Sequence, residues 1–306
     1  MTVNNDGWPA EQFEAHIFET HRAHLRSVAY RMLGSLTEAD DAVQEAWLRL
    51  ARAGTGDVRD LRAWLTTVVS RVCLDMLRSR ASRREQSLDA DAEVRVPDPI
   101  VTRVDDAPEE HAVLADSIGI ALLVVLDTLS PTERLAFVLH DVFAMPFEQI
   151  GPVLDRSPAA AKQLASRARR RLRDAPTRPA GLARQWTVVD AFLAASREGD
   201  FEGLLAILDP DIVLRADAGT GPLGPSTLVR GARDVLAQAR RFAPLGRFAR
   251  KVLVNGGPGF LVTRDGQALA LIALTVQDGK VTEMDILADP VRLRHLDLIG
   301  LTENAE

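Results

Sequence analysis

Residues 141–173 read DVFAMPFEQIGPVLDRSPAAAKQLASRARRRLR and carry the most specific pattern in the chain. The second half begins with Ser157 as a candidate helix N-cap and Pro158 at the first helical position. At about 100° per residue, its apolar side chains fall on one side of a helix and its basic and polar side chains on the other. The first half, Pro146 to Asp155, predicts a shorter helix, and a tight polar turn joins the two. This plan is a helix-turn-helix, in which the second helix enters the major groove of DNA.

The polar side of the second helix is the expected DNA-contacting surface. No acidic residue lies between Arg156 and Arg173. Small residues at 159–161 permit a close approach to the groove, and the arginines further along suit phosphates. The alternative is a basic helix that is merely solvated. The residues expected to contact DNA are Ser157, Ala160, Lys162, Gln163, Ser166, Arg167 and Arg170.

The composition allows several globular domains and an uneven charge distribution. The chain has 306 residues, of which 46% are hydrophobic, which leaves room for two or three domains with cores of their own. The net charge of −6 would discourage nucleic-acid binding if it were evenly spread. Basic residues instead concentrate in 71–84 and 156–173, and acidic residues in 38–45 and 89–116. Local charge decides binding, so the negative net charge does not exclude a nucleic-acid partner.

Several classes of protein are not expected from the sequence. The single cysteine, Cys73, allows no internal disulfide and is predicted to be a small core residue. We expect no signal peptide, no membrane contact and a cytoplasmic location, because the apolar runs are far shorter than the ~20 residues of a membrane span. His111 and His140 stand apart, without the spacing of metal ligands. No metal site and no cofactor are therefore expected.

Residues 10–85 predict a helical domain with an unusual acidic face. Helices are expected over Phe13–Gly34, Glu38–Arg52 and Leu61–Arg80, with Thr37 capping the second. A leucine stands among the acids on the exposed side of that second helix. Such a surface suggests a protein partner with basic and apolar groups, and an ordinary exposed leucine is the alternative. The residues of this face are Asp40, Asp41, Gln44, Glu45 and Leu48.

The outer face of the third helix places a tryptophan beside arginines. This combination suits unstacked bases and their phosphates. The alternative for Trp64 is a core position at the start of the helix. The candidate contacts are Arg62, Trp64, Thr67, Ser70, Arg71 and Arg78.

Three segments together resemble the extracytoplasmic function (ECF) sigma factors. They are YRMLGSLTEADDAVQEAWLRL (30–50), DLRAWLTTVVSRVCLDMLRSRASRR (60–84) and LSPTERLAFVLHDVFAMPFEQIGPVLDRSPAAAKQLASRARRRLR (129–173). The first two resemble region 2 and the third resembles region 4, in the order typical of the family. The resemblance implies core RNA polymerase (β′ clamp and β flap) and promoter DNA as partners. It also implies that the acidic face docks on the β′ clamp and that the helix from Ser157 reads the −35 element. The 54–60 loop and the 61–80 helix would open the −10 element.

Residues 86–110 are rich in Asp, Glu and Pro and predict a largely extended acidic linker. Residues 95–100 loosely resemble a Pro-containing linker motif of the sigma factors that carry a C-terminal extension. A passive tether is the alternative. Beyond the linker, residues 111–175 predict the second helical domain, with Ser130 to Glu133 capping one of its helices.

Residues 185–300 predict an α+β domain. Helical segments are expected first and strands later, and the hairpin turns between the strands contain glycine. The order resembles the SnoaL-like, NTF2-like fold that the extended sigma subgroup carries, which implies regulation in cis and an intramolecular contact with the sigma domains. Segments 217–221 and 288–290 partly match the motifs of that subgroup. The expected helices are 186–197, 201–208 and 231–242, and the expected strands are 212–215, 248–255, 259–264, 267–276 and 280–287.

The leading hypothesis is a multi-domain transcription initiation factor, with two all-α sigma domains, a C-terminal NTF2-like domain and no catalytic residue. The second is a stand-alone helix-turn-helix regulator whose NTF2-like domain binds a small molecule. A third is an enzyme in the extension. It is disfavoured because the only tyrosine is Tyr30, which leaves the C-terminal domain without a phenolic proton donor. Asp217 is interpreted as a loop residue and Asp285 as a strand residue that faces solvent.

Overall fold

The computed structural model describes residues 10–53, 60–86, 94–104, 119–172, 181–221, 223–298 and 300–301. The chain divides into two compact units. The first consists of Met1–Leu88 and Val125–Asp174, and the second of Asp89–Val124 and Ala175–Glu306. The central segment therefore belongs to the unit that contains the C-terminal residues.

The first part of the helical unit consists of α1 (Ala10–Leu33), α2 (Leu36–Ala53) and α3 (Leu61–Gln86), as predicted. Gly34, with φ of 66°, ends α1, and Ser35 accepts a hydrogen bond from the Glu38 amide at 3.4 Å. The predicted cap, Thr37, is wrong, because the helix already begins at Leu36. Cys73 is a free, buried core residue, and burial raises its pKa to about 12.

The second part of the helical unit forms the predicted helix-turn-helix. It contains α6 (Pro131–Phe137), the π-helical η2 (Val138–Val142), α7 (Phe147–Val153) and α8 (Pro158–Arg171). Helix α5 (Ile120–Leu126) precedes them. The predicted capping box is confirmed, because the Ser130 amide donates to Glu133 at 3.2 Å and Ser130 Oγ accepts from the Glu133 amide at 3.4 Å. The beginning of the predicted 111–129 helix, with His111, lies outside the described residues.

The two parts of the helical unit pack against each other. Arg71 of α3 donates to the backbone oxygen of Pro152 at 2.7 Å. The fully buried Arg134 of α6 forms an ion pair with Asp127 and donates to the backbone oxygen of Arg31 at 3.3 Å. The buried guanidinium is satisfied by these partners, as the burial of a charge requires. Regions that the sequence presents as two separate domains thus belong to one compact unit.

The second unit contains a seven-stranded sheet in the order β1-β4-β5-β6-β7-β2-β3. Neighbouring strands are antiparallel except for β2 and β7, which run parallel. The Asn255-Gly256, Asp265-Gly266 and Asp278-Gly279 pairs have positive φ at both positions, which is the type I′ geometry that joins tight hairpins. The strands are β1 (Val101–Thr102), β2 (Leu208–Asp217), β3 (Thr227–Arg230), β4 (Ala249–Val254), β5 (Gly257–Arg264), β6 (Gln267–Gln277) and β7 (Lys280–Leu287).

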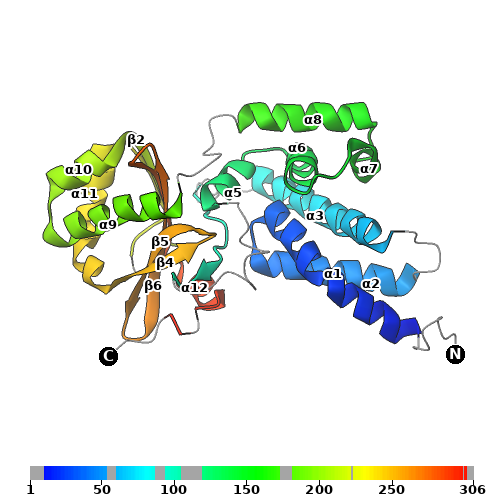
Figure 1. The fold of residues 1–306 in the computed structure, drawn as a ribbon, viewed down its shortest axis with the longest axis horizontal. Coiled ribbons are helices and arrows are strands. Elements are labelled where there is room, and N and C mark those ends of the chain that lie inside the picture. Colours follow the sequence, from blue (N-terminus) through cyan, green and yellow to red (C-terminus); the bar gives the residue numbers. More distant parts are fainter. Residues whose placement is uncertain are drawn as a thin grey trace. The chain divides into compact units, whose positions relative to one another are not determined.

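Helices cover one face of this sheet, and a short helix packs on the other (Figure 1). Helices α9 (Leu182–Glu198), α10 (Phe201–Ile207) and α11 (Ala232–Phe242), with η3 (Ala243–Phe248), lie on the first face. Helix α12 (Pro290–His295) packs on the second face beside residues of the linker. The predicted α+β fold of the C-terminal domain is confirmed. The sequence patterns did not predict strands β1 and β3 or helix α12.

Candidate promoter and polymerase interfaces

The turn before α8 is built around a close backbone approach. A Cβ atom at Gly151 would lie 2.8 Å from the backbone oxygen of Arg156, a distance that only glycine avoids without a shift of the chain. The Arg156 amide donates to the Gly151 oxygen at 2.9 Å, and Asp155 adopts a left-handed φ of 54°. Ser157 then caps α8 by accepting from the Ala160 amide at 3.2 Å, as predicted. These contacts fix the start of α8 against α7.

The predicted DNA-contacting residues share the open side of α8. Its buried side consists of Ala161, Ala165 and Ala168. Every predicted contact is exposed except Ala160, which is half-buried. The arginines of the helix fall into two classes. Arg169 pairs with Asp141 at 2.7 Å and Arg171 pairs with Glu133 at 3.4 Å, both within the helical unit. Among the described residues, Lys162, Arg167 and Arg170 form no ion pair.

The acidic face of α2 is exposed, and its charges are partly neutralised. Asp40 accepts a two-pronged hydrogen bond from Arg26 at 2.7 and 3.1 Å, and Glu45 pairs with Arg49 at 3.0 Å. Asp41 and Gln44 are exposed, and so is Leu48, at 39% of its surface. The predicted residues therefore form one continuous side of α2, with an apolar side chain within an acidic border.

The outer face of α3 is less accessible than its sequence predicts. Arg62 and Arg78 are exposed, and Trp64 and Thr67 are half-buried. Ser70 is fully buried, and its hydroxyl has no hydrogen-bond partner, so it does not lie on the exposed face. Arg71 is exposed but donates to the Pro152 oxygen, as described above. The predicted 54–60 loop lies outside the described residues, except for Asp60.

His24, which no sequence pattern indicated as a site residue, contacts Arg62. His24 Nε2 lies 3.3 Å from Thr66 Oγ1, and its Nδ1 lies 3.5 Å from Arg62 Nη2. The Thr66 hydroxyl donates to the Arg62 backbone oxygen at 2.7 Å, so the His24 Nε2 hydrogen must donate to Thr66 while Nδ1 accepts from Arg62. Burial and the neighbouring Arg62 charge lower the pKa of His24 to about 4. The neutral imidazole therefore positions this arginine at physiological pH.

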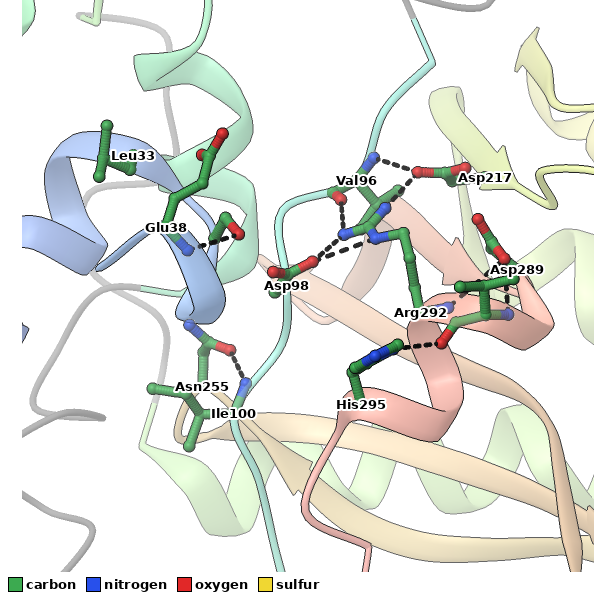
Figure 2. A network of polar contacts seen from close by, with 12 residues as sticks. Leu33, Glu38, Val96, Asp98, Ile100, Asp217, Asn255, Asp289, Arg292 and His295 are labelled. Carbon is green, nitrogen blue, oxygen red and sulfur yellow. Dashed lines mark hydrogen bonds and ion pairs between the residues drawn. The ribbon is translucent and has the colours of Figure 1, made fainter. Parts of the chain in front are cut away.

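The linker is held by Arg292 of α12, which is the centre of a polar network in the second unit (Figure 2). Its guanidinium donates to the Val96 backbone oxygen at 2.7 Å and to Asp98 at 3.1 Å through Nε. It also forms an ion pair with Asp217, whose carboxylate accepts a hydrogen bond from the Val96 amide at 3.1 Å. Because residues 94–104, the described part of the linker, are extended as predicted, both their backbone and their side chains are available for these contacts.

Two further contacts continue the attachment of the linker. Ile100 donates to the side-chain oxygen of Asn255 at 2.9 Å and accepts from the Asn255 amide at 2.8 Å (Figure 2). Val101 and Thr102 then pair with β4 as strand β1. Val96 is 1% exposed and packs in an apolar cluster with Leu287 and Leu293. The interpretation of the linker as a passive tether does not hold for residues 96–102, which form part of the sheet domain.

The interpretation of Asp217 as a loop residue is wrong, because it is the last residue of β2 and is 9% exposed. The two partial motifs meet at this point. Asp289 caps α12 by accepting from the Val291 amide at 2.8 Å, and a Cβ at Gly219 would lie 2.6 Å from the Asp289 carboxylate. Segments 217–221 and 288–290 are therefore one structural feature, which positions Arg292 and Asp217.

The interpretation of Asp285 as a solvent-facing residue is also wrong. Its side chain is 1% exposed and lies 3.0 Å from Arg215, which also contacts Glu283 at 3.1 Å. Burial raises the pKa of Asp285 to about 6, although the Arg215 charge opposes the shift. Within the described parts of the chain there is no group of three potential metal ligands. No helix there is long and apolar enough to span a membrane.

Comparison with known proteins identifies the family. Residues 17–83 match Sigma-70 region 2, and residues 120–172 match Sigma-70, region 4. The chain is 41% identical over 293 residues to the ECF RNA polymerase sigma factor SigJ of Mycobacterium tuberculosis (strain ATCC 25618 / H37Rv), with 90% of this chain and 92% of SigJ covered. It is 35% identical over 287 residues to the probable ECF sigma factor SigI of Mycobacterium tuberculosis (strain CDC 1551 / Oshkosh), with 90% of this chain and 93% of SigI covered.

The fold supports the same assignment. The crystal structure of Mycobacterium tuberculosis SigJ superimposes with a TM-score of 0.73 and 36% identity, and the match covers 95% of this chain and 100% of that chain. Both helical regions and the sheet domain therefore have counterparts in one solved protein. The chain belongs to the extracytoplasmic function sigma factors of RNA polymerase.

Proposed function

We propose that this sigma factor joins core RNA polymerase in the cytoplasm through the acidic face of α2 and reads the −35 element with α8. The observation that carries the proposal is the division of α8 into an alanine side and an open side. The open side holds the expected base and phosphate contacts, and its Lys162, Arg167 and Arg170 have charges that no ion pair occupies among the described residues.

The face of α2 supports docking on a basic and apolar surface of the polymerase. Leu48 is the apolar anchor, and Asp41 is an exposed carboxylate about two turns away on the same face. Exposed apolar side chains with a polar border are typical of protein interfaces. Family resemblance assigns this face to the β′ clamp and region 4 to the β flap.

Opening of the −10 element is assigned to α3, and it requires a change in the helical unit. The contact between Arg71 and the Pro152 oxygen occupies one candidate DNA contact, and Ser70 is buried. Separation of α3 from α7 would free the Arg71 guanidinium for promoter DNA. The compact helical unit is thus a form that must open before both promoter elements are bound.

The second unit is proposed to regulate initiation in cis by holding the linker. In the family, this segment runs through the polymerase toward the active-site channel. Residues 96–102 cannot follow that path while Arg292, Asp217 and Asn255 bind them to the sheet domain. Release of the linker is therefore a step that precedes or accompanies productive initiation.

The experiment is run-off transcription with purified core polymerase on promoters selected from genomic DNA. The Asp41→Lys/Glu45→Lys double variant should abolish the transcript while the free protein still binds DNA. Glu19→Lys, an exposed charge reversal on α1, is the matched control and should leave the transcript intact. Transcription by the double variant at the level of the control would contradict the assignment of α2 to polymerase docking.

The linker step has its own test. Arg292→Ala should increase the transcript, because it removes the contacts to Val96, Asp98 and Asp217. Arg294→Ala alters an exposed arginine on the same helix and should have no effect. Equal amounts of transcript from both variants would contradict regulation by linker retention, but they would not contradict the sigma function itself.

A further inference from the structure

The sheet domain contains a cavity of about 240 Å³ between its helices and its sheet. Helices α9 and α11 and η3 form one wall, and strands β2, β5, β6 and β7 form the other. Most of the lining side chains are apolar, as at Phe192, Phe260 and Ile286. Among the described residues that line the cavity, none is charged. The polar side chains in the lining are those of Ser196, Thr227 and Gln238.

The volume and the lining define a class of ligand. An apolar cavity of about 150 Å³ accommodates benzene, and sites for drug-sized molecules begin at about 300 Å³. The cavity lies between these sizes, so it suits a molecule of one or two rings or a branched chain of similar bulk. An ionised group would be buried here without a counter-charge, which is strongly unfavourable. The hydroxyl of Thr227 and the amide of Gln238 can satisfy a hydroxyl or carbonyl group on a neutral ligand.

Strand β2 connects this cavity to the linker through alternating side chains. Ala216 and Ala218 line the cavity. Asp217 lies between them and directs its carboxylate to the other face, where it binds the Val96 amide and Arg292 (Figure 2). A shift of the end of β2 on the cavity side therefore moves the carboxylate that holds the linker.

Strand β7 repeats this arrangement. Ile286 and Ala288 face the cavity, whereas Leu287 between them packs in the apolar cluster that contains Val96. The Ala288 amide also donates to the Asp217 backbone oxygen at 2.7 Å, which joins the end of β7 to the end of β2. The cavity and the linker are thus on opposite sides of the same two strand ends.

We propose that the cavity binds a small, neutral, largely apolar molecule and that binding strengthens the attachment of linker residues 96–102 to the opposite face of the sheet. The cavity exists in the form in which the linker is attached. A ligand that fills it stabilises that form by mass action over any form in which the strand ends move apart. The proposal deepens the linker regulation proposed above, but its test requires neither polymerase nor DNA, so the two can fail separately.

Binding is tested on the full chain with 2-naphthalenemethanol and 2-naphthoate, which share a ring system but differ in charge, by saturation-transfer NMR and fluorescence titration. The alcohol should bind saturably, and the carboxylate should bind at least about tenfold more weakly because its charge would be buried. No saturable binding of the alcohol, or equal binding of both probes, would overturn the proposal.

Variants locate the binding site. Ala239→Leu fills the cavity from α11, and the matched control, Ala237→Leu, adds the same bulk to the exposed side of that helix. Ala243→Leu fills the cavity from η3 and replaces Ala239→Leu if that variant does not fold, as judged by circular dichroism. The filling variant should weaken binding by at least about tenfold, because overpacking opposes the ligand. The control should not change the affinity for 2-naphthalenemethanol. Equal affinities of the filling variant and the control would show that the probe binds outside the cavity and would overturn the proposal.

The link to the linker is tested by hydrogen–deuterium exchange. Saturating 2-naphthalenemethanol should slow exchange of the Val96 and Ile100 amides, both of which are hydrogen-bonded to the sheet domain. The slowing should be absent in the cavity-filling variant. If exchange of the Val96 and Ile100 amides does not change when the cavity is fully occupied, the proposed effect of the ligand on the linker is wrong.

Discussion

The two candidate DNA-binding helices, α8 and α3, differ in how ready they are to bind. Helix α8 buries an alanine side, and its expected contacts lie open on the other side. On α3, Ser70 is buried and Arg71 is bonded to the helix-turn-helix region. If the proposed assignments hold, one fold contains an open surface for DNA and a second surface that a rearrangement must uncover.

The difference follows from the composition of the two faces. Most polar residues on α8 are lysine or arginine, and long charged side chains favour water over a protein core. The outer face of α3 mixes Trp64, Thr67 and Ser70 with its arginines, and such small or apolar side chains can be buried against a neighbouring helix. A face that must receive unstacked bases is also a face that other protein segments can cover.

The largest expected effect tests base reading by α8. The Lys162→Ala/Gln163→Ala double variant should reduce discrimination at the −35 element by about 1–3 kcal/mol for each base that the helix no longer reads. Competition binding with promoter variants measures it. Unchanged promoter choice would show that these two residues do not read bases.

The next effect concerns the turn that positions α8. Gly151→Ala should weaken the docking of α8 by about 1–3 kcal/mol, because the new Cβ would contact the Arg156 backbone oxygen. Hydrogen–deuterium exchange of residues 158–171 should accelerate accordingly. Gly119→Ala is the control, since a Cβ there meets no atom within 4 Å. Equal exchange in the two variants would argue against the close approach as the cause.

Phosphate contacts by α8 are expected to have a smaller, salt-dependent effect. Arg167→Ala/Arg170→Ala should reduce the slope of log affinity against log salt by about two, uniformly across DNA sequences. Arg169→Ala alters an arginine already paired with Asp141 and should change the slope less. Fluorescence anisotropy at several salt concentrations distinguishes the two. The same slope in both variants would show that arginines with and without an ion pair on α8 do not differ in phosphate binding.

The smallest effect tests the covered face of α3. Arg71→Ala removes the hydrogen bond to the Pro152 oxygen. It should lower the free energy of local opening of α7 by about 1 kcal/mol and accelerate hydrogen–deuterium exchange of the α7 amides accordingly. Arg78→Ala, an exposed change on the same helix, should not affect α7. If neither variant affects α7, the two helices are not held together by this contact.

Local patterns predicted the local features well. The Ser157 cap, the capping box at Ser130, the four C-terminal strands and the exposed Leu48 all follow from short-range chemistry or periodicity. The roles of Asp217 and Asp285 were missed because their partners are distant in sequence. Arg292 follows Asp217 by 75 residues and Arg215 precedes Asp285 by 70, and no pattern in one sequence reveals such pairings.

The attachment of the linker could not be predicted for the same reason. Val96 and Ile100 stand among acidic and proline residues, and their apolar character has no period. Their partners, Asp217 and Asn255, come 121 and 155 residues later. A segment without a periodic apolar pattern can still form a strand when another part of the chain provides the sheet edge that it pairs with, as β4 does for β1.

The pairing of β1 with β4 also has a consequence for synthesis on the ribosome. Val101 pairs with Val254, so the linker leaves the ribosome well before its partner strand exists. Helices α1 to α3 are translated before the linker, and α5 to α8 are translated in that interval, so all of them can begin to fold before β4 is made, since domains generally fold as they emerge. The nascent sigma regions therefore complete their chain while the linker is still unbound. Attachment of the linker closes a long loop late in biogenesis, after the segments it connects have been made.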